Sequence, residues 1–192
     1  MDADPIMKLM IPIVVAVSAL ALQEDAPDAP DAPPALQVLE QHEWLGQYVG
    51  EWDVTSETRM EPGAEPARMT SIESARSIGP LWVVGEGSAD SNGVAFSSVL
   101  TLGYDPEKES FVGTWIDSVT PYLWTFAGQL DDAKNALTLD TEGPRWGVIG
   151  TRAKYRERHE FVDADHRTTA SSIQNEDGSW FTFLRTDCRR KK

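Results

Sequence analysis

The sequence predicts an all-β protein, a single up-and-down antiparallel β-barrel of about ten strands preceded by one short helix. Three observations lead to this prediction. After Gly46, apolar and polar side chains alternate with the period of a half-buried strand. Turn sequences such as DPEKE, VDADH and EDG recur at intervals of roughly ten residues. No segment of useful length after Gly46 has the spacing of an amphipathic helix.

The helix is expected directly before the strands. In the segment ALQVLEQHEWLG, the apolar residues Leu36, Leu39, Trp44 and Leu45 recur near helical spacing, and Gly46 follows them. Because glycine readily adopts the backbone conformation that ends a helix, we expect the helix to stop at this point. It would come immediately before the first strand.

The strands are expected to be joined by short turns throughout. Their predicted positions are 48–59, 68–78, 81–89, 94–104, 110–118, 122–130, 136–141, 152–163, 167–175 and 179–186. Closure of such a chain of hairpins into a barrel leaves no strand edge exposed, which favours a barrel. A sandwich of two sheets is the competing arrangement, and the absence of a long crossover connection in the sequence argues against it.

The N-terminus has the features of a secretory signal peptide. Lys8 is followed by an apolar run that is too short to span a bilayer comfortably, and Ala19 and Ala21 fit an A-x-A cleavage site. Residues 1–21 are therefore predicted to be a signal peptide whose natural start is Met7. We expect the protein to be exported to the periplasm or the cell exterior, without a stable membrane span after cleavage. An uncleaved anchor is the alternative.

An acidic linker is expected to follow the signal peptide. Residues 22–35 contain the sequence Asp-Ala-Pro three times. Proline blocks helix and sheet hydrogen bonding and the acidic groups repel one another, so this segment should form an extended tether without a core. Residues 36–189 would then form the barrel domain.

Composition and motif content exclude several classes of function. The formal net charge is −14, whereas nucleic-acid phosphates require a basic face, so no nucleic acid is expected as a partner. Cys188 is the only cysteine and cannot form an internal disulfide. His42, His159 and His166 lie on different predicted elements, which argues against a zinc site. The sequence also lacks a nucleophile elbow and a phosphate loop, so we expect neither a metal nor catalytic residues.

The eighth predicted strand places ionisable groups on an otherwise aromatic face. Tyr155, Glu157, His159 and Phe161 share this face by alternation. Buried charge is costly unless it is paired or hydrated. Glu157 and His159, together with Asp117, are therefore expected to line a water-accessible cavity, or else to form an internal hydrogen-bond network.

Asp117 has two interpretations. It shares a strand face with Trp115 and lies at the strand end, just before the turn sequence SVTP. It would either accept hydrogen bonds from the turn backbone, which its position favours, or meet the polar end of a ligand. Tryptophans would form the apolar wall of the cavity, with simple core filling as the alternative for each. The candidate ligand-binding residues are Trp82, Tyr104, Trp115, Asp117, Trp124, Glu157 and His159.

The central sequence resembles a known bacterial family. The segment LGYDPEKESFVGTWIDSVTPYLWTFAGQLDD is similar to the signature of domain-of-unknown-function family fifteen seventy-nine, through the joint occurrence of GYD and WIDS. An early GEWDV, the segment LWVVGEG and the final EDGSWFTFLRTD agree with it in outline. The resemblance covers Leu36 to Arg189. It implies a barrel of the calycin superfamily and no established activity.

A looser similarity to lipocalins implies how the barrel closes. Lipocalins place a G-x-W sequence on the first strand, after a short helix, and an arginine late on the last strand that stacks over that tryptophan. Here Gly50-Glu51-Trp52 follows the predicted helix, and Arg185 lies on the last predicted strand. The resemblance therefore implies a structural cation–π contact between Trp52 and Arg185. The lipocalin disulfide and the long helix after the barrel are missing.

Together these features indicate a barrel that binds a small hydrophobic or amphipathic molecule. One alternative is an enzyme, because some calycin-like barrels catalyse reactions with interior acid–base groups, which Tyr104, Glu157 and His159 would imitate. The other is a filled barrel with a structural or interaction role in the cell envelope. No cofactor is expected, with haem held by His159 as the alternative.

Overall fold

A computed structural model of the chain describes residues 37–91 and 94–192. The predicted signal peptide and the predicted acidic linker lie outside the described residues, so both stay predictions. Gln37–Lys192 form one compact unit. Within the described part of the chain, no helix is long and apolar enough to cross a membrane.

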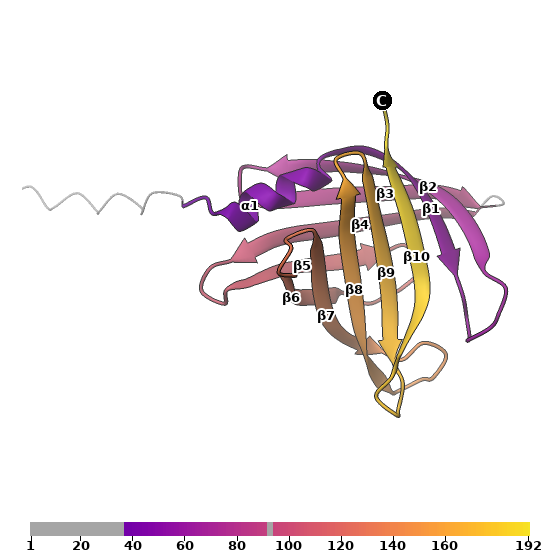
Figure 1. Ribbon diagram of the computed structural model, residues 1–192. Coiled ribbons are helices and arrows are strands. Elements are labelled where there is room, and N and C mark those ends of the chain that lie inside the picture. The colour runs from indigo at the N-terminus through magenta and orange to yellow at the C-terminus, as the bar shows by residue number, and fades with distance from the viewer. Residues whose placement is uncertain (1–36, 92–93) are drawn as a thin grey trace, which may run out of the picture. The chain divides into compact units, whose positions relative to one another are not determined.

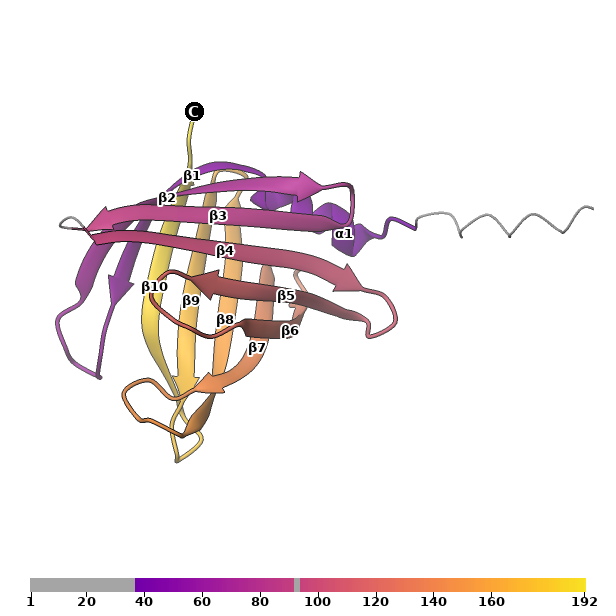
Figure 2. The same cartoon turned by 180° about the vertical axis from the view of Figure 1, so that it is seen from behind.

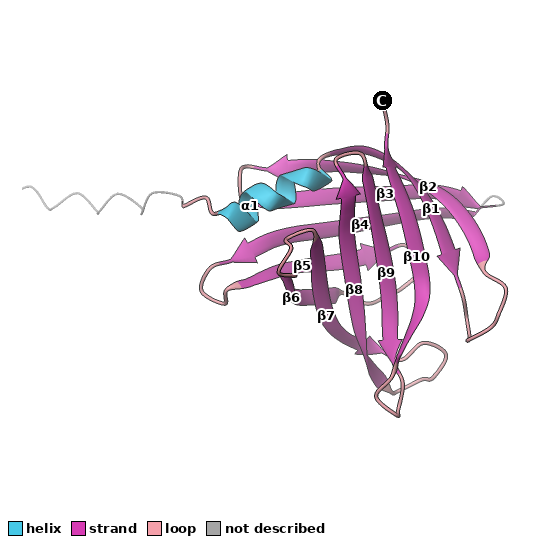
Figure 3. Cartoon of the chain, viewed as in Figure 1, coloured by secondary structure: helices cyan, strands magenta, loops and turns pink. Residues whose placement is uncertain are grey.

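The described residues form a closed antiparallel barrel (Figures 1 and 2). Each strand pairs with its neighbours in sequence, and β1 pairs with β10 to close the ring. The predicted up-and-down barrel with one short helix before it is confirmed, and Figure 3 shows how completely strands dominate. The elements are α1 (Glu40–Leu45), a 3-10 turn η1 (Gly46–Tyr48), β1 (Gly50–Thr58), β2 (Ala67–Ile78), β3 (Trp82–Ser91), β4 (Val94–Asp105), β5 (Ser110–Asp117), β6 (Trp124–Leu130), β7 (Ala136–Pro144), β8 (Arg152–Asp163), β9 (His166–Gln174) and β10 (Trp180–Arg190).

Alternation along each strand separates the interior from the surface. On β8, Tyr155, His159 and Phe161 are buried, whereas Arg152 and Lys154 are exposed. Side chains on successive residues of a strand point to opposite faces, so the same pattern places Glu157 and His159 inside the barrel and the basic residues of β8 outside. The predicted inward face of this strand is therefore confirmed.

The helix and the 3-10 turn close one end of the barrel. Leu45 and Tyr48 are buried there. The Trp44 ring makes edge contacts with Phe111 and Phe161, at centroid distances of 5.7 and 5.5 Å. These contacts join the helix to β5 and β8, so the closed end is filled by aromatic side chains from several elements.

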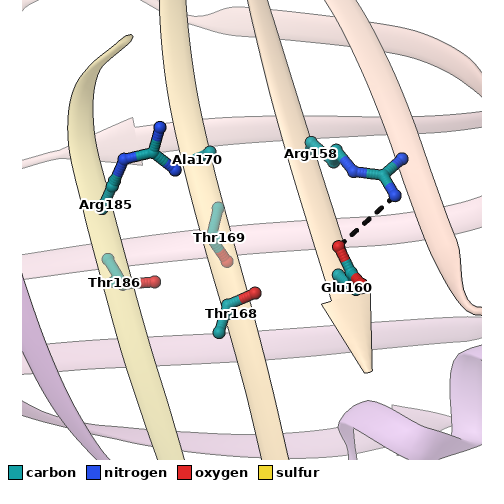
Figure 4. Close-up of a pocket in the computed structure, with 7 residues that line it drawn as sticks. All are labelled: Arg158, Glu160, Thr168, Thr169, Ala170, Arg185 and Thr186. Carbon is teal, nitrogen blue, oxygen red and sulfur yellow. Dashed lines mark hydrogen bonds and ion pairs between the residues drawn. The ribbon is translucent and has the colours of Figure 1, made fainter. Parts of the chain in front are cut away.

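The predicted closing arginine is wrong. Arg190, not Arg185, lies over Trp52, with its guanidinium carbon 4.1 Å from the ring centroid. Trp52 pairs in register with Arg190, whereas Arg185 pairs with Glu57, five residues further along β1. A bulge on β10 between Thr182 and Leu184 also shifts the pairing register with β9. A bulge moves the following residues to the opposite face. Arg185 is therefore exposed on the outside of the barrel (Figure 4), whereas Arg190 reaches Trp52.

Candidate functional site

The barrel encloses a cavity of about 1090 Å³ above its closed end. Residues of the β1–β2, β5–β6, β7–β8 and β9–β10 connections line it, so its mouth lies at the end opposite to α1. The β7–β8 connection places Trp146 and Val148 at this mouth, both partly exposed. The volume is at the upper end of the range of small-molecule sites.

Most of the predicted site residues line this cavity. Trp115, Asp117, Trp124, Glu157 and His159 all contribute to its wall. They come from β5, β6 and β8, and alternation turns each of them inward. The structure thus brings these five residues to one cavity, and ligand binding by them stays a prediction.

Trp82 and Tyr104 do not line the cavity, and their predicted placement is wrong. Trp82 lies on the outer face of β3, 41% exposed, against Gly103 of β4, where a methyl group would collide with the indole ring. Tyr104 lies at the closed end, where its ring contacts Phe111 and His42 of the helix. Tyr104 shares the inward face of β4 with Phe96, Ser98 and Leu100, which line the cavity, but it lies beyond them toward the closed end.

Asp117 ties down the turn after β5. Its Oδ1 accepts hydrogen bonds from the backbone N–H groups of Val119 and Thr120, at 2.9 and 2.6 Å. Its Oδ2 accepts one from the indole Nε1 of Trp115 at 3.1 Å. The carboxylate therefore fixes both the turn and an aromatic ring of the cavity wall. Of the two interpretations of Asp117, these contacts favour the turn-tying role.

An ion pair crosses the deep part of the barrel. The Nη2 atom of Arg167 on β9 donates to Oε1 of Glu73 on β2 at 2.8 Å. The Arg167 side chain is 2% exposed, and its guanidinium carbon lies 4.7 Å from the Tyr48 ring centroid and 5.3 Å from that of Trp52. Burial is the largest effect on Arg167 and opposes its charge, but the Glu73 carboxylate, Cys188 and Tyr48 together hold the pKa of Arg167 above its usual range.

Glu157 is the second acidic group in the interior. Ser171 on β9 donates a hydrogen bond of 2.5 Å to its Oε2. The carboxyl group is enclosed by the barrel wall but faces the cavity. Burial raises the pKa of Glu157 to about 7, and the Ser171 hydroxyl only partly offsets this. Because no basic side chain in the described ranges pairs with it, Glu157 changes its charge near neutral pH.

His159 lies one inward position deeper on the same strand. Its ring contacts Tyr48 at a centroid distance of 5.8 Å. Burial lowers the pKa of His159 to about 3, with a further contribution from the charge of Arg167, so the imidazole is neutral at physiological pH. Its Nδ1 atom is buried without a hydrogen-bond partner in the described part of the structure.

Two further polar atoms near this wall lack partners among the described residues. They are Oγ1 of Thr141 on β7 and Nε of Arg167 on β9, the strands on either side of β8. Each unpaired buried polar group costs about 1–3 kcal/mol. The inner faces of β7, β8 and β9 thus form a polar wall of the cavity, defined by Thr141, Glu157, His159, Arg167 and Ser171, although the unpaired atoms themselves are buried.

A smaller pocket of about 270 Å³ involves the outer faces of β8, β9 and β10 (Figure 4). Arg158 and Arg185 lie in register with Ala170, one on each side. Arg158 is already paired with Glu160 at 3.3 Å and with Asp131 at 3.5 Å. Its charge is thus satisfied locally, unlike that of the interior carboxyl group.

Sequence reasoning missed Arg167 and Glu73. An arginine after a turn is normally expected on the surface, and the faces of these two strands were not assigned. Alternation on β9 places Arg167 on the same face as Ser171, which bonds to Glu157. That shared face was the available signal. Across residues 37–91 and 94–192, no group of three His, Cys, Asp or Glu side chains is placed to hold a metal ion.

The fold and the cavity define a ten-stranded up-and-down barrel with a ligand-sized interior. The chain belongs to a family of proteins of unknown function, DUF1579, whose model matches residues 37–190. The predicted membership in that family is thereby confirmed. No curated protein matches the sequence.

Solved structures share the barrel architecture. The crystal structure of Rv2717c from M. tuberculosis aligns with a TM-score of 0.55 and 11% identity, over 81% of this chain and 100% of that one. A redesigned β-barrel aligns over 82% of this chain and 100% of its own length, with 11% identity and a TM-score of 0.43. At such identities, the similarity to Rv2717c shows the fold alone.

Proposed function

We propose that the protein binds a small apolar or amphipathic molecule inside the barrel. The observation that carries this proposal is the cavity of about 1090 Å³, which joins an aromatic wall to a polar wall that includes the carboxyl group of Glu157. A barrel with a structural role alone would gain stability by filling this space with side chains. A ligand with an apolar body and one polar group matches both walls.

The aromatic wall supports the apolar part of the proposal. Trp124 contacts Tyr155 edge-on at 5.0 Å, and Tyr155 contacts Phe183 at 6.2 Å. Trp115 lies beside Trp124 in register on the neighbouring strand. Rings held by one another keep their orientation without a ligand, which lowers the entropic cost of binding.

We also propose that the protein works after export. The support comes from the sequence alone: a short apolar run with an A-x-A site, followed by an acidic tether. Mass spectrometry of the protein expressed from its natural start tests this proposal. A mature chain that begins after Ala21 is expected, and an intact N-terminus in the cytoplasm would contradict it.

Binding is tested with the uncharged fluorophore N-phenyl-1-naphthylamine, whose emission rises in apolar sites. We expect saturable binding by the wild-type protein. Ser71→Trp places a large ring in the cavity and should abolish the signal, because Ser71 lines it. Thr70→Trp is the matched control, because Thr70 is exposed on the same strand. Absence of binding, or equal loss in both variants, would overturn the proposal.

A further inference from the structure

Glu157 differs from the other carboxyl groups that line the cavity. Glu73 is paired with Arg167, and Asp117 accepts hydrogen bonds from two backbone N–H groups and an indole. Glu157 has one hydrogen bond, from the Ser171 hydroxyl, and no basic partner among the described residues. A buried carboxylate normally has a cationic partner or several donors, so its partner is missing from the chain itself.

Aromatic rings lie next to this carboxyl group. Tyr155 is the neighbouring inward residue on β8, one step closer to the mouth, and Trp124 and Phe183 contact its ring. The faces of such rings attract cations, most strongly where water is excluded. The formal net charge of −14 also favours the approach of cations over anions.

From this arrangement we propose that the cavity binds an organic amine in its protonated form, with Glu157 as the counter-ion and the aromatic wall around the apolar body. This inference rests on the proposed binding function and names its ligand class. Ammonium hydrogens would be donated to the free carboxylate oxygen. His159, one inward position away on the same strand, also lines the cavity and is neutral, so it adds no charge that would compete with Glu157 for the ammonium.

The other head groups fit less well. A carboxylate would be repelled by ionised Glu157 and would find, among the described residues, only Arg145 near the mouth as a cation, because the charge of Arg167 is already used by Glu73. An uncharged hydroxyl would bond to the polar wall but would leave the charge of Glu157 uncompensated above neutral pH. Only a cation stabilises the ionised form of Glu157, and its binding releases the proton that this group holds.

Other ionisable groups share the interior with Glu157. Among the described residues that face the cavity, β7 contributes only the uncharged Thr141 beside it. Neither the Arg167–Glu73 pair nor any other charged side chain contributes to the shifted pKa of Glu157, which arises from burial and the Ser171 hydrogen bond. The remaining titratable groups that line the cavity are Tyr155 and His159 on β8, Arg167 on β9, Cys188 on β10, Glu73 on β2, Asp117 on β5, and Glu61 and Arg145 in the connections at the mouth.

Displacement of N-phenyl-1-naphthylamine by octylammonium, 1-octanol and octanoate tests the ligand class. At pH 8, octylammonium should displace the probe at a concentration at least about tenfold lower than 1-octanol, and octanoate should be weakest. Glu157→Gln keeps the size of the side chain and removes its charge, so it should abolish this preference, measured relative to the affinity of the variant itself for the probe. Glu160→Gln, on the outer face of the same strand, should change neither the preference nor the affinity for the probe.

The pH dependence gives a second readout. Since Glu157 ionises near pH 7, the apparent affinity for octylammonium should rise about tenfold between pH 6 and pH 8. Equal displacement by octylammonium and octanol, or an amine preference that persists in Glu157→Gln, would overturn this inference. Saturable binding of the probe in the same experiment would still support the cavity as a binding site. A wild-type protein that binds no probe would overturn the proposed function itself.

Discussion

Two pairs of ionisable side chains lie inside the same barrel and differ in how they are satisfied. Arg167 and Glu73 form a direct ion pair across the deep part of the barrel. Glu157 and His159 lie on the β8 wall, where Ser171 supplies the only hydrogen bond to them from the described residues. The first pair is built to hold the fold. The second pair lines the cavity without a charged partner in the described ranges, and ionisable groups in such surroundings are characteristic of binding sites.

The largest expected effect follows from breaking the deep ion pair. Arg167→Met leaves the partly buried Glu73 without a partner and should lower the free energy of unfolding by about 3 kcal/mol. Urea denaturation measures the loss. Adding Glu73→Leu should recover much of it, because the uncompensated charge is then gone. Arg158→Met, on the outer face, is the control. A loss no larger than that of the control would contradict a structural role for the pair.

The second prediction compares two arginines on β10. Besides stacking over Trp52, Arg190 donates from Nη2 to the backbone oxygen of Gln47 at 3.0 Å and from Nε to that of Ala164 at 3.0 Å. Arg190→Ala should therefore cost about 1–3 kcal/mol of stability. Arg185→Ala should cost nothing measurable. Thermal or urea unfolding of both variants checks this, and the reverse order would restore the pairing that the sequence suggested.

The third prediction concerns stability against pH. Glu157 has a folded pKa of about 7, against 4.5 for an ordinary glutamate, so the folded protein binds more protons between these values. Stability from this group is fully present below pH 4.5 and is lost as the pH rises through about 7. Glu157→Gln should remove this loss and be more stable than wild type at pH 8 by roughly 2–3 kcal/mol.

His159 should produce the opposite effect, a loss of stability at acidic pH. Its folded pKa of about 3 lies below the 6.5 of an ordinary histidine, so its contribution is present above pH 6.5 and is lost as the pH falls toward 3. His159→Phe should flatten the acid side only. Denaturation midpoints at several pH values separate the two limbs. If neither substitution changed the dependence of stability on pH, the conclusion that Glu157 and His159 are buried without charged partners in the described part of the chain would be contradicted.

The smallest effect is expected at the mouth of the barrel. Asp117→Ala removes the acceptor of the turn after β5 and should lower stability by about 1 kcal/mol. Since its carboxylate is already satisfied by the turn and by Trp115, octylammonium affinity should stay nearly unchanged. Probe displacement on this variant tests the point. A loss of affinity as large as that of Glu157→Gln would assign a binding role to Asp117 as well.

Much of the fold and part of the site were accessible from the sequence, because strand alternation is strictly local. The inward face of β8 and the position of Asp117 at a strand end follow from it directly. The strong alternation of aromatic and ionisable residues on β8 pointed to an interior that carries ionisable groups. The barrel topology followed from short turns between all strands.

The errors arose where local alternation is insufficient. A bulge on β10 turns Arg185 outward, and the β1–β10 register, which is not visible in one sequence, places Arg190 rather than Arg185 beside Trp52. Trp82 faces outward because its neighbour Val83 takes the buried inward position on β3, and its indole covers Gly103 on the neighbouring strand. The Arg167–Glu73 pair joins strands that are far apart in the chain, so no local sequence pattern predicts it.

The central claim is that the wall formed by Glu157 and His159 is reserved for a ligand, whereas Arg167 and Glu73 maintain the fold. Calorimetric titration of octylammonium at pH 8 into wild type and Glu157→Gln tests it most directly. We predict measurable binding by wild type, at least about tenfold weaker binding by the variant, and no loss of stability in the variant. Equal affinity in both proteins would contradict the claim.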